Sequence, residues 1–305
     1  MKKIFYLPGL LILVVLITIG SGIRLDIPIE KLKAKYTNEK SKFVVINGLP
    51  VHYRDEGKGF PLVLLHGSPS SLHTWDGLAR ELSKQYRVIR LDLPGYGLTG
   101  PNATGDYSLE WYVRFLDSFL SALHVDSFYL AGHSFGGGLA SEFAFEKKAR
   151  VKKLILIAAS GYPVKGNDIL AVKMARNPLL RPMVRYVTPR FFVAMNVKEA
   201  YGPGNNVSDE TIDRYYDLLR RTGNRDTFIA MCNHGTPDIS AHIKTLRVPT
   251  LILWGSLDTA VPPRNSEFFN RDIPGSRLIM YNGVGHVPQE VIPEKVTADI
   301  QAFLR

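Results

Sequence analysis

The chain has 305 residues, enough for one large α/β domain or two modest domains. Hydrophobic residues make up 45% and charged residues 22%, a balance that supports a packed core and excludes a disordered or low-complexity chain. The formal net charge of +10 leaves an anionic membrane surface or an acidic substrate as candidate partners, or simply a solvated basic surface. Nucleic acid is disfavoured because the sequence has neither zinc-ligand spacing nor an aromatic RNA-binding motif. Cys232 is the single cysteine, so an intrachain disulfide is impossible.

The first 25 residues contain an uncharged run from Ile4 to Ile23, about the length that crosses a bilayer as a helix. A basic start followed by an apolar middle fits an uncleaved single-pass anchor and also a cleaved secretory signal segment. Because no clear A-x-A cleavage site follows, we expect an N-terminal anchor in residues 1–25 that places the protein in the membrane. The alternative is a secreted or periplasmic protein after cleavage. Residues 26–42 are expected to be a polar linker.

The rest of the chain alternates between short apolar runs and amphipathic stretches. Residues 43–53 predict a hairpin around Asn47 and Gly48, because Asn-Gly favours the tight turn that joins antiparallel strands. Further strands are predicted at 61–65, 86–91, 128–131, 151–158, 249–254 and 277–281, and helices at 107–123, 135–148, 267–270 and 293–304. This alternation predicts an α/β fold with a mostly parallel sheet and helices on both faces.

The alternation is interrupted between about 162 and 241, where Pro and Gly separate helical stretches. We expect a helical cap at 162–241, inserted between two parts of the core at 43–161 and 242–305. Between positions 165 and 190 this cap has six basic residues and one acidic residue among apolar ones. Such a face is typical either of an ordinary solvated amphipathic helix or of a lid that lies on an anionic lipid surface.

Gly132-His133-Ser134-Phe135-Gly136 is a G-x-S-x-G pentapeptide that follows a predicted strand and opens a predicted helix. That context is typical of a nucleophile elbow, in which the serine occupies a strained turn and projects its Oγ above the sheet. The glycines two residues before and after Ser134 leave room for the turn. We expect Ser134 to be the nucleophile.

A serine alcohol is a weak nucleophile and needs an adjacent base. Asp258 and His286 each follow a predicted strand, at the strand ends where ligands of open α/β sheets bind. We expect His286 to take the Ser134 proton and Asp258 to fix the tautomer of that histidine. Two backbone amides, those of Ser68 and Phe135, are expected to form the oxyanion hole.

Three polar residues near these motifs are expected to have structural roles. His66 should hold its loop by hydrogen bonding, His133 should pack beside the elbow, and Asp92 should stabilise a turn. No cofactor and no metal site is predicted, because serine-based hydrolysis needs neither.

Together these motifs resemble the α/β-hydrolase superfamily over roughly 43–305, and the resemblance implies an eight-stranded sheet with a lid. The loop at 66–71 and the Gly223-Asn224-Arg225 stretch are similar to the haloalkane dehalogenase and epoxide hydrolase branch. That branch uses an aspartate where this chain has Ser134. Dehalogenases also bind halide through an asparagine near position 68 and a tryptophan after the nucleophile, where this chain has Ser68 and Phe135. Dehalogenation and epoxide opening are therefore disfavoured.

A serine nucleophile fits hydrolysis of a small-molecule carboxylic ester, which we expect to be apolar or lipid-like. One alternative is hydrolytic carbon–carbon cleavage, as in the similar ring-fission-product hydrolases. Another is a receptor-like hydrolase that binds a small signal molecule. The fold by itself does not choose among them.

Overall fold

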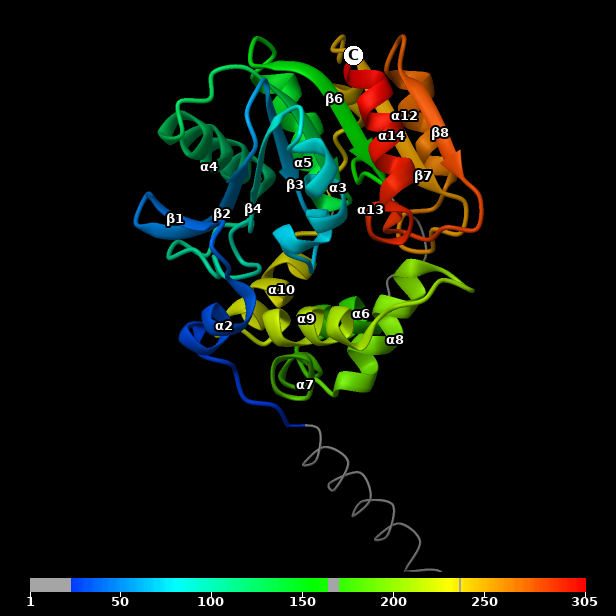
Figure 1. The fold of residues 1–305 in the computed structure, drawn as a ribbon. Coiled ribbons are helices and arrows are strands. Elements are labelled where there is room, and N and C mark those ends of the chain that lie inside the picture. Colours follow the sequence, from blue (N-terminus) through cyan, green and yellow to red (C-terminus); the bar gives the residue numbers. More distant parts are fainter. Residues whose placement is uncertain (1–22, 164–169, 236) are drawn as a thin grey trace, which may run out of the picture.

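The computed structural model describes residues 23–163, 170–235 and 237–305. Its core is an eight-stranded sheet in the order β1-β2-β4-β3-β5-β6-β7-β8 (Figure 1). The strands are β1 (Ser41–Ile46), β2 (Leu49–Glu56), β3 (Pro61–Leu65), β4 (Arg87–Leu91), β5 (Phe128–His133), β6 (Val151–Ile157), β7 (Thr250–Gly255) and β8 (Arg277–Tyr281). Strand β2 pairs antiparallel with β1 and β4, and the other pairs are parallel. The predicted mostly parallel, eight-stranded α/β fold is confirmed.

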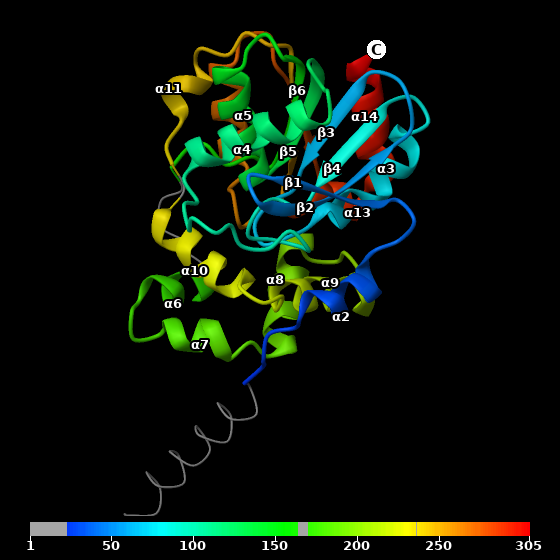
Figure 2. The same ribbon diagram turned by 90° about the vertical axis from the view of Figure 1, so that its left-hand side faces the viewer.

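Helices cover both faces of the sheet (Figures 1 and 2). The core helices are α3 (Asp76–Leu82), α4 (Leu109–Ala122), α5 (Phe135–Glu146), α11 (Ser240–Ile243), α12 (Arg264–Asp272), α13 (Pro288–Val291) and α14 (Pro293–Leu304), with the short 3₁₀ turn η1 (Leu72–Trp75). Phe119, Phe143 and Phe269 from α4, α5 and α12 pack on one face. Trp75 from η1 and Ile300 from α14 pack on the other face of the sheet. Strands buried on both faces are continuous apolar runs, which is why the sequence pattern located them.

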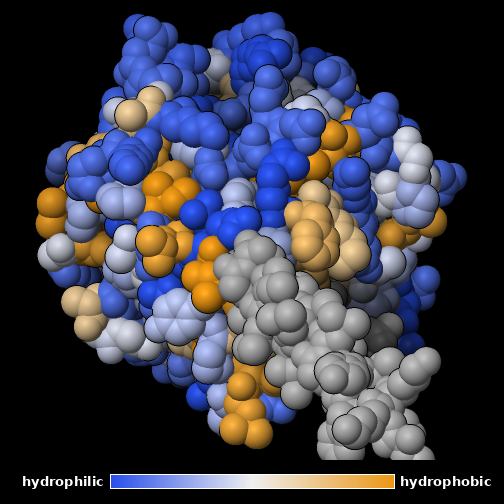
Figure 3. Space-filling view, turned by 90° about the horizontal axis from the view of Figure 1, so that it is seen from below, coloured by the Kyte–Doolittle hydropathy of each residue, from blue (hydrophilic) through white to orange (hydrophobic). Residues whose placement is uncertain are grey.

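In the described residues, five of the six helices between β6 and β7 form the cap below the sheet (Figure 1). They are α6 (Leu170–Arg176), α7 (Arg181–Tyr186), α8 (Arg190–Tyr201), α9 (Asp209–Leu219) and α10 (Asn224–His234). Helix α9 begins after Ser208, whose side chain accepts a hydrogen bond from the Thr211 amide and caps the helix. Seen from the cap side, exposed hydrophobic residues lie among hydrophilic ones (Figure 3); Leu179 and Phe191 are 87% and 72% exposed.

Residues 23–36, which we call the N-terminal strap, lie along the cap and contain α2 (Ile29–Tyr36) (Figures 1 and 2). Backbone hydrogen bonds join the strap to the segments that follow α7 and α9. Its Leu32 is buried against the cap and the loop after β4. Much of the segment expected to be a polar linker, 26–42, is thus packed against the domain, because α2 has an apolar side that the cap covers.

The predicted membrane span at 4–23 lies, apart from Ile23, outside the described residues. Within the described ranges, no helix is both long enough and apolar enough to cross a bilayer. This finding corrects the predicted localisation as a single-pass membrane protein.

Candidate active site

Ser134 lies in the turn between β5 and α5, with φ at 53° and ψ at −119°. A residue with a side chain rarely adopts this conformation, so the turn stores backbone strain. A Cβ atom at Gly132 would lie 2.1 Å from the Gly136 carbonyl oxygen, and one at Gly136 would lie 2.4 Å from the Leu65 carbonyl oxygen. The turn therefore requires glycine on both sides of Ser134. It leaves the serine half-buried at the end of the strand.

His286 and Asp258 form a buried pair, with 2.8 Å between His286 Nδ1 and Asp258 Oδ2. The other carboxylate oxygen, Oδ1, accepts hydrogen bonds from the amides of Ala260 and Val261, each at 2.9 Å. These two bonds orient the carboxylate so that Oδ2 faces the imidazole. Because the carboxylate accepts from Nδ1–H, the second ring nitrogen, Nε2, is the one that can accept a proton.

Ser134 and His286 are brought to one corner of the molecule by their neighbours. The rings of His133 and His286 lie 4.8 Å apart between centroids, and His133 Nε2 donates to the His286 carbonyl oxygen at 2.9 Å. A Cβ atom at Gly67 would lie 2.8 Å from the Ser134 Cβ. In the described part of the chain no hydrogen bond joins Ser134 Oγ to His286; such catalytic bonds often tighten only when substrate binds.

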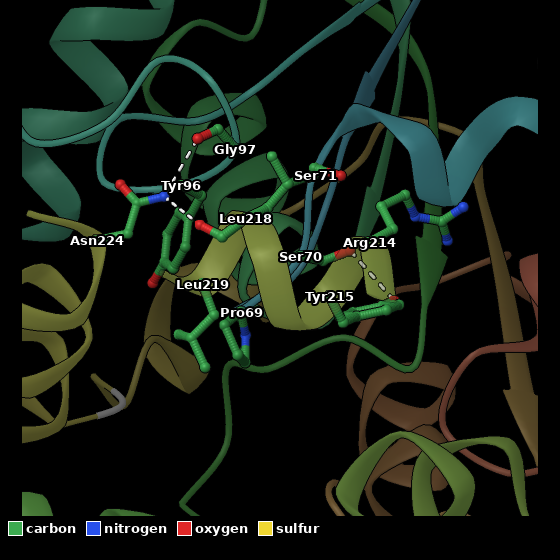
Figure 4. Close-up of a pocket in the computed structure, with 10 residues that line it drawn as sticks. All are labelled: Pro69, Ser70, Ser71, Tyr96, Gly97, Arg214, Tyr215, Leu218, Leu219 and Asn224. Carbon is green, nitrogen blue, oxygen red and sulfur yellow. Dashed lines mark hydrogen bonds between the residues drawn. The ribbon is translucent and has the colours of Figure 1, made fainter. Parts of the chain in front are cut away.

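The two predicted oxyanion donors flank the same corner. Phe135 is the first residue of α5, so its amide is among those that have no partner within the helix. Ser68 lies in the loop after β3, where Tyr96 Oη donates to Ser68 Oγ at 2.8 Å. Ser70 Oγ donates to Tyr215 Oη at 3.3 Å, so this loop is held from the core and from the cap. A small cavity of about 20 Å³ separates the loop from α9 (Figure 4).

His66 and Asp92 hold the loops of the core, whereas His133 packs against His286 and lines the cavity beside it. His66 Nε2 accepts from the Leu93 amide at 2.9 Å. Asp92 is fully buried; it accepts two backbone amides and lies 2.7 Å from His52 Nδ1. Burial alone would raise the pKa of the Asp92 carboxyl, but the neighbouring histidines, His52 foremost, lower it below its ordinary value. Burial and the neighbouring His286 lower the pKa of His133, which stays neutral. Within the described residues, no cluster of potential ligands could hold a metal.

A cavity of about 190 Å³ lies between the cap and the corner that holds His286. Gly67, Ser68 and His286 line the end of the cavity at this corner. Most of the remaining lining is apolar and comes from the cap: Met174, Val184, Val187, Phe192, Val193, Val197, Leu219 and Phe228. Polar side chains of the cap also reach this lining: Thr188 from the connection after α7, Asn196 and Tyr201 from α8, Tyr215 from α9 and Arg225 from α10. The cavity suits a small, largely apolar group next to the histidine.

A family profile described as alpha/beta hydrolase fold matches residues 61–293. The chain belongs to the α/β-hydrolase fold family. A 2-hydroxy-6-oxo-2,4-heptadienoate hydrolase from Pseudomonas putida is 30% identical over 258 residues, which are 81% of this chain and 90% of the relative. A pimeloyl-[acyl-carrier protein] methyl ester esterase from Legionella pneumophila is 28% identical over 244 residues, covering 78% of this chain and 92% of the relative. The solved structure of a meta-cleavage product hydrolase from Pseudomonas fluorescens superposes with a TM-score of 0.78 at 25% identity, covering 88% of this chain and 98% of that one.

In this α/β hydrolase, one buried carboxylate joins the cap to the core. Glu290 Oε2 accepts from Tyr201 Oη at 2.8 Å and from Arg214 Nη2 at 2.9 Å. Its Oε1 accepts from Tyr215 Oη and Thr74 Oγ1, both at 2.5 Å. The tyrosines and the arginine belong to α8 and α9, so the carboxylate binds two cap helices at once. Glu290 was not predicted from the sequence; the available signal was an acidic residue within an apolar stretch soon after the predicted base.

The backbone around His286 is also bonded to the cap. The His286 amide donates to the Ala200 carbonyl oxygen at 2.6 Å, and the Gly285 amide donates to the Tyr201 carbonyl oxygen at 3.1 Å. A Cβ atom at Gly285 would lie 2.4 Å from the Ala200 carbonyl oxygen, so glycine permits this close approach. The end of α8 therefore supports the loop that carries the histidine of this hydrolase.

Proposed function

We propose that this protein is a serine hydrolase that cleaves carboxylic esters with a small-to-medium apolar acyl group. The observation that carries the proposal is the buried Asp258–His286 pair, at 2.8 Å, beside a serine in a strained strand-to-helix turn. A nucleophile, a base and a group that orients the base are what acyl transfer to an alcohol requires.

In the proposed mechanism, Ser134 Oγ attacks the ester carbonyl carbon while His286 Nε2 takes its proton. The carbonyl oxygen becomes an oxyanion, which the amides of Phe135 and Ser68 stabilise. His286 then gives the proton to the departing alcohol oxygen, and the acyl group stays on Ser134. A water molecule, deprotonated by His286, attacks the acyl-enzyme, and the carboxylic acid leaves with Ser134 restored.

The cavity favours an uncharged acyl group. Its described lining is mainly apolar, and Arg225 is the one arginine, lysine or acid within it. That guanidinium already binds Asp26, with 2.7 Å between Arg225 Nη2 and Asp26 Oδ1. An acyl chain in this cavity would replace water by apolar contacts, which stabilise binding by about 0.8 kcal/mol for each buried methylene.

A second candidate activity is hydrolysis of a carbon–carbon bond, favoured by the relatives whose names state that chemistry. The name of the Pseudomonas putida relative specifies a substrate that carries a carboxylate. Such a group needs a cation free to bind it, and Arg225 is already paired with Asp26. For this reason the ester is the first candidate.

The test is release of nitrophenol from p-nitrophenyl esters, from acetate to dodecanoate, by the full-length protein. We expect Ser134→Ala to lower kcat by roughly 10⁴-fold or more, whereas Ser121→Ala, at an exposed serine, should leave kcat unchanged. A fluorophosphonate should label the wild-type protein at Ser134 and leave Ser134→Ala unlabelled. Equal turnover by wild type and Ser134→Ala would refute the proposal. Consumption of a ring-fission product without nitrophenol release would favour carbon–carbon cleavage.

A further inference from the structure

Asp26, in the N-terminal strap, binds arginines from two different cap helices. Arg185 Nη1 and Nη2 donate to its two oxygens at 3.0 and 2.9 Å, and Arg225 Nη2 donates to Oδ1 at 2.7 Å. Arg185 belongs to α7 and Arg225 to α10. The carboxylate therefore joins two helices that are separated by about 40 positions in the chain and that both contribute to the cavity lining.

Arg225 is a wall residue of the cavity, and its side chain is only 2% exposed. Its Nη1 donates to Thr188 Oγ1 at 3.0 Å, and its Nη2 also donates to the Arg24 carbonyl oxygen at 2.7 Å. Thr188 lines the same cavity. A buried guanidinium is stable only beside an opposite charge, because removing it from water is costly. Asp26 supplies that charge.

The charge on Asp26 persists at neutral pH. Burial raises the pKa of its carboxyl, but the hydrogen bonds and charges of Arg185 and Arg225 outweigh burial and lower that pKa below its ordinary value. Arg185 also contacts Asp226, with 2.6 Å between Arg185 Nε and Asp226 Oδ1. Two cations and two carboxylates thus balance in this cluster.

We propose that Asp26 is a specificity-determining residue, through which the N-terminal strap holds one wall of the acyl cavity. The wall consists of Val187, Thr188 and Arg225, which we call the strap-side wall. The strap contacts it three times, through the Asp26 carboxylate, through the Arg24 carbonyl oxygen and through the bridge between Ile23 and Val187. The inference rests on the proposed function, because it assigns a wall of the same ester-binding cavity.

The position of the strap-side wall determines which acyl groups contact it. We expect an acetyl group to occupy only the end of the cavity beside Gly67, Ser68 and His286. The strap-side wall comes entirely from the cap, and we expect only larger acyl groups to reach it. Loosening this wall should weaken binding of larger esters and leave the chemistry at Ser134 unchanged.

Asp26→Asn tests this in the full-length protein, because it removes the charge and keeps the shape. We expect KM for the longest ester that the wild type accepts well to rise by about tenfold or more, with kcat and the acetate KM changed less than about twofold. Asp26→Glu, which keeps the charge, should lie nearer to wild type. The control is Asp209→Asn, which removes an exposed carboxylate of the cap paired with Arg190, and should leave every parameter unchanged.

Amide hydrogen exchange reports how readily the strap-side wall opens, and it does not depend on ester turnover. We expect 184–188 and 225–228 to exchange faster in Asp26→Asn than in wild type or Asp209→Asn. If Asp26→Asn keeps the ester selectivity of wild type, the inference is overturned, whether or not its amide exchange is faster. If wild type cleaves no ester but exchange in Asp26→Asn is faster, the proposed function fails while the wall assignment stands. Should Asp26→Asn not fold, Arg185→Gln removes the other arginine that Asp26 binds, lies outside the cavity lining, and carries the same expectation.

Discussion

Replacing Glu290 tests how the cap and the candidate catalytic histidine are held together. The carboxylate accepts four hydrogen bonds, three of them from the cap, and its side chain is 7% exposed. In Glu290→Gln the amide oxygen can keep the bonds from Thr74 and Tyr215. The amide nitrogen then faces the Arg214 guanidinium, donor against donor, while the Tyr201 hydroxyl can rotate and accept. The main loss is therefore the partner of the Arg214 charge.

The magnitude follows from how far Arg214 is buried. Removing one partner of a buried ion pair costs about 3–5 kcal/mol. The Arg214 side chain keeps 18% exposure, so we expect the lower end, about 3 kcal/mol in the free energy of unfolding. The unfolding entropy is about 2.1 cal/mol/K per residue, so in a chain of 305 residues each kcal/mol shifts Tm by roughly 1.5–2 °C, and Tm should fall by about 5 °C.

Thermal unfolding followed by circular dichroism measures this effect, with ester turnover recorded in parallel. Glu294→Gln, at an exposed carboxylate in α14, is the control and should shift Tm by less than about 1 °C. Combining Glu290→Gln with Arg214→Met removes the unpaired charge and should recover part of the lost stability. A fall in Tm of less than about 2 °C in Glu290→Gln would refute the reasoning, because the carboxylate would then not hold the cap.

Three further predictions address the candidate site and its surroundings. Asp258→Asn should lower kcat by about 10⁴-fold with little loss of stability, because its oxygen can keep the backbone bonds while its amide imposes the wrong tautomer on His286. Ester kinetics check this, and a loss of less than about tenfold would contradict it. Gly67→Ala should lower kcat/KM by about tenfold or more, since the new Cβ would lie 2.8 Å from the Ser134 Cβ; unchanged kinetics would count against the assigned loop. Burial lowers the pKa of three histidines below 6.5. Below that pH the folded protein therefore binds fewer protons at these residues than the unfolded chain does. The stability that is present above pH 6.5 should then be lost as the pH falls toward about 4. The three are His66, His73 and His133. The slope should approach two protons, about 3 kcal/mol per pH unit, from His73 and His133, with His66 adding to it; urea unfolding across that range would refute the prediction if stability stayed constant.

The sheet could be predicted because its signals are local. The run at 61–65 and the run at 151–158 appear as β3 (Pro61–Leu65) and β6 (Val151–Ile157). Strands buried on both faces must be apolar throughout, so composition reveals them. The Asn47-Gly48 turn could be predicted equally well, since both residues adopt the positive φ that the hairpin needs.

Each candidate site residue could be predicted from its own local motif. How these residues come together in space could not. The glycines beside Ser134 follow from the tightness of the elbow, a constraint within five positions. That Asp258 lies 2.8 Å from His286 depends on β7 and β8 being neighbours in the sheet. The order of strands, and with it the meeting of these loops, is a tertiary property. The catalytic roles themselves stay predictions.

The sequence by itself determined the fold class, the elbow and the loops that carry the candidate residues, because each depends on sterics and hydrophobic periodicity over a few residues. Only the tertiary structure decided that Asp26 pairs with Arg225 across 199 positions, that Glu290 binds α8 and α9, and that the predicted linker packs on the cap. From the sequence alone, a charged side chain could equally be solvated by water or be paired with a residue far away in the chain. Its role is settled by which surfaces the folded chain buries together, and the free energy of that burial depends on contacts that no local pattern records.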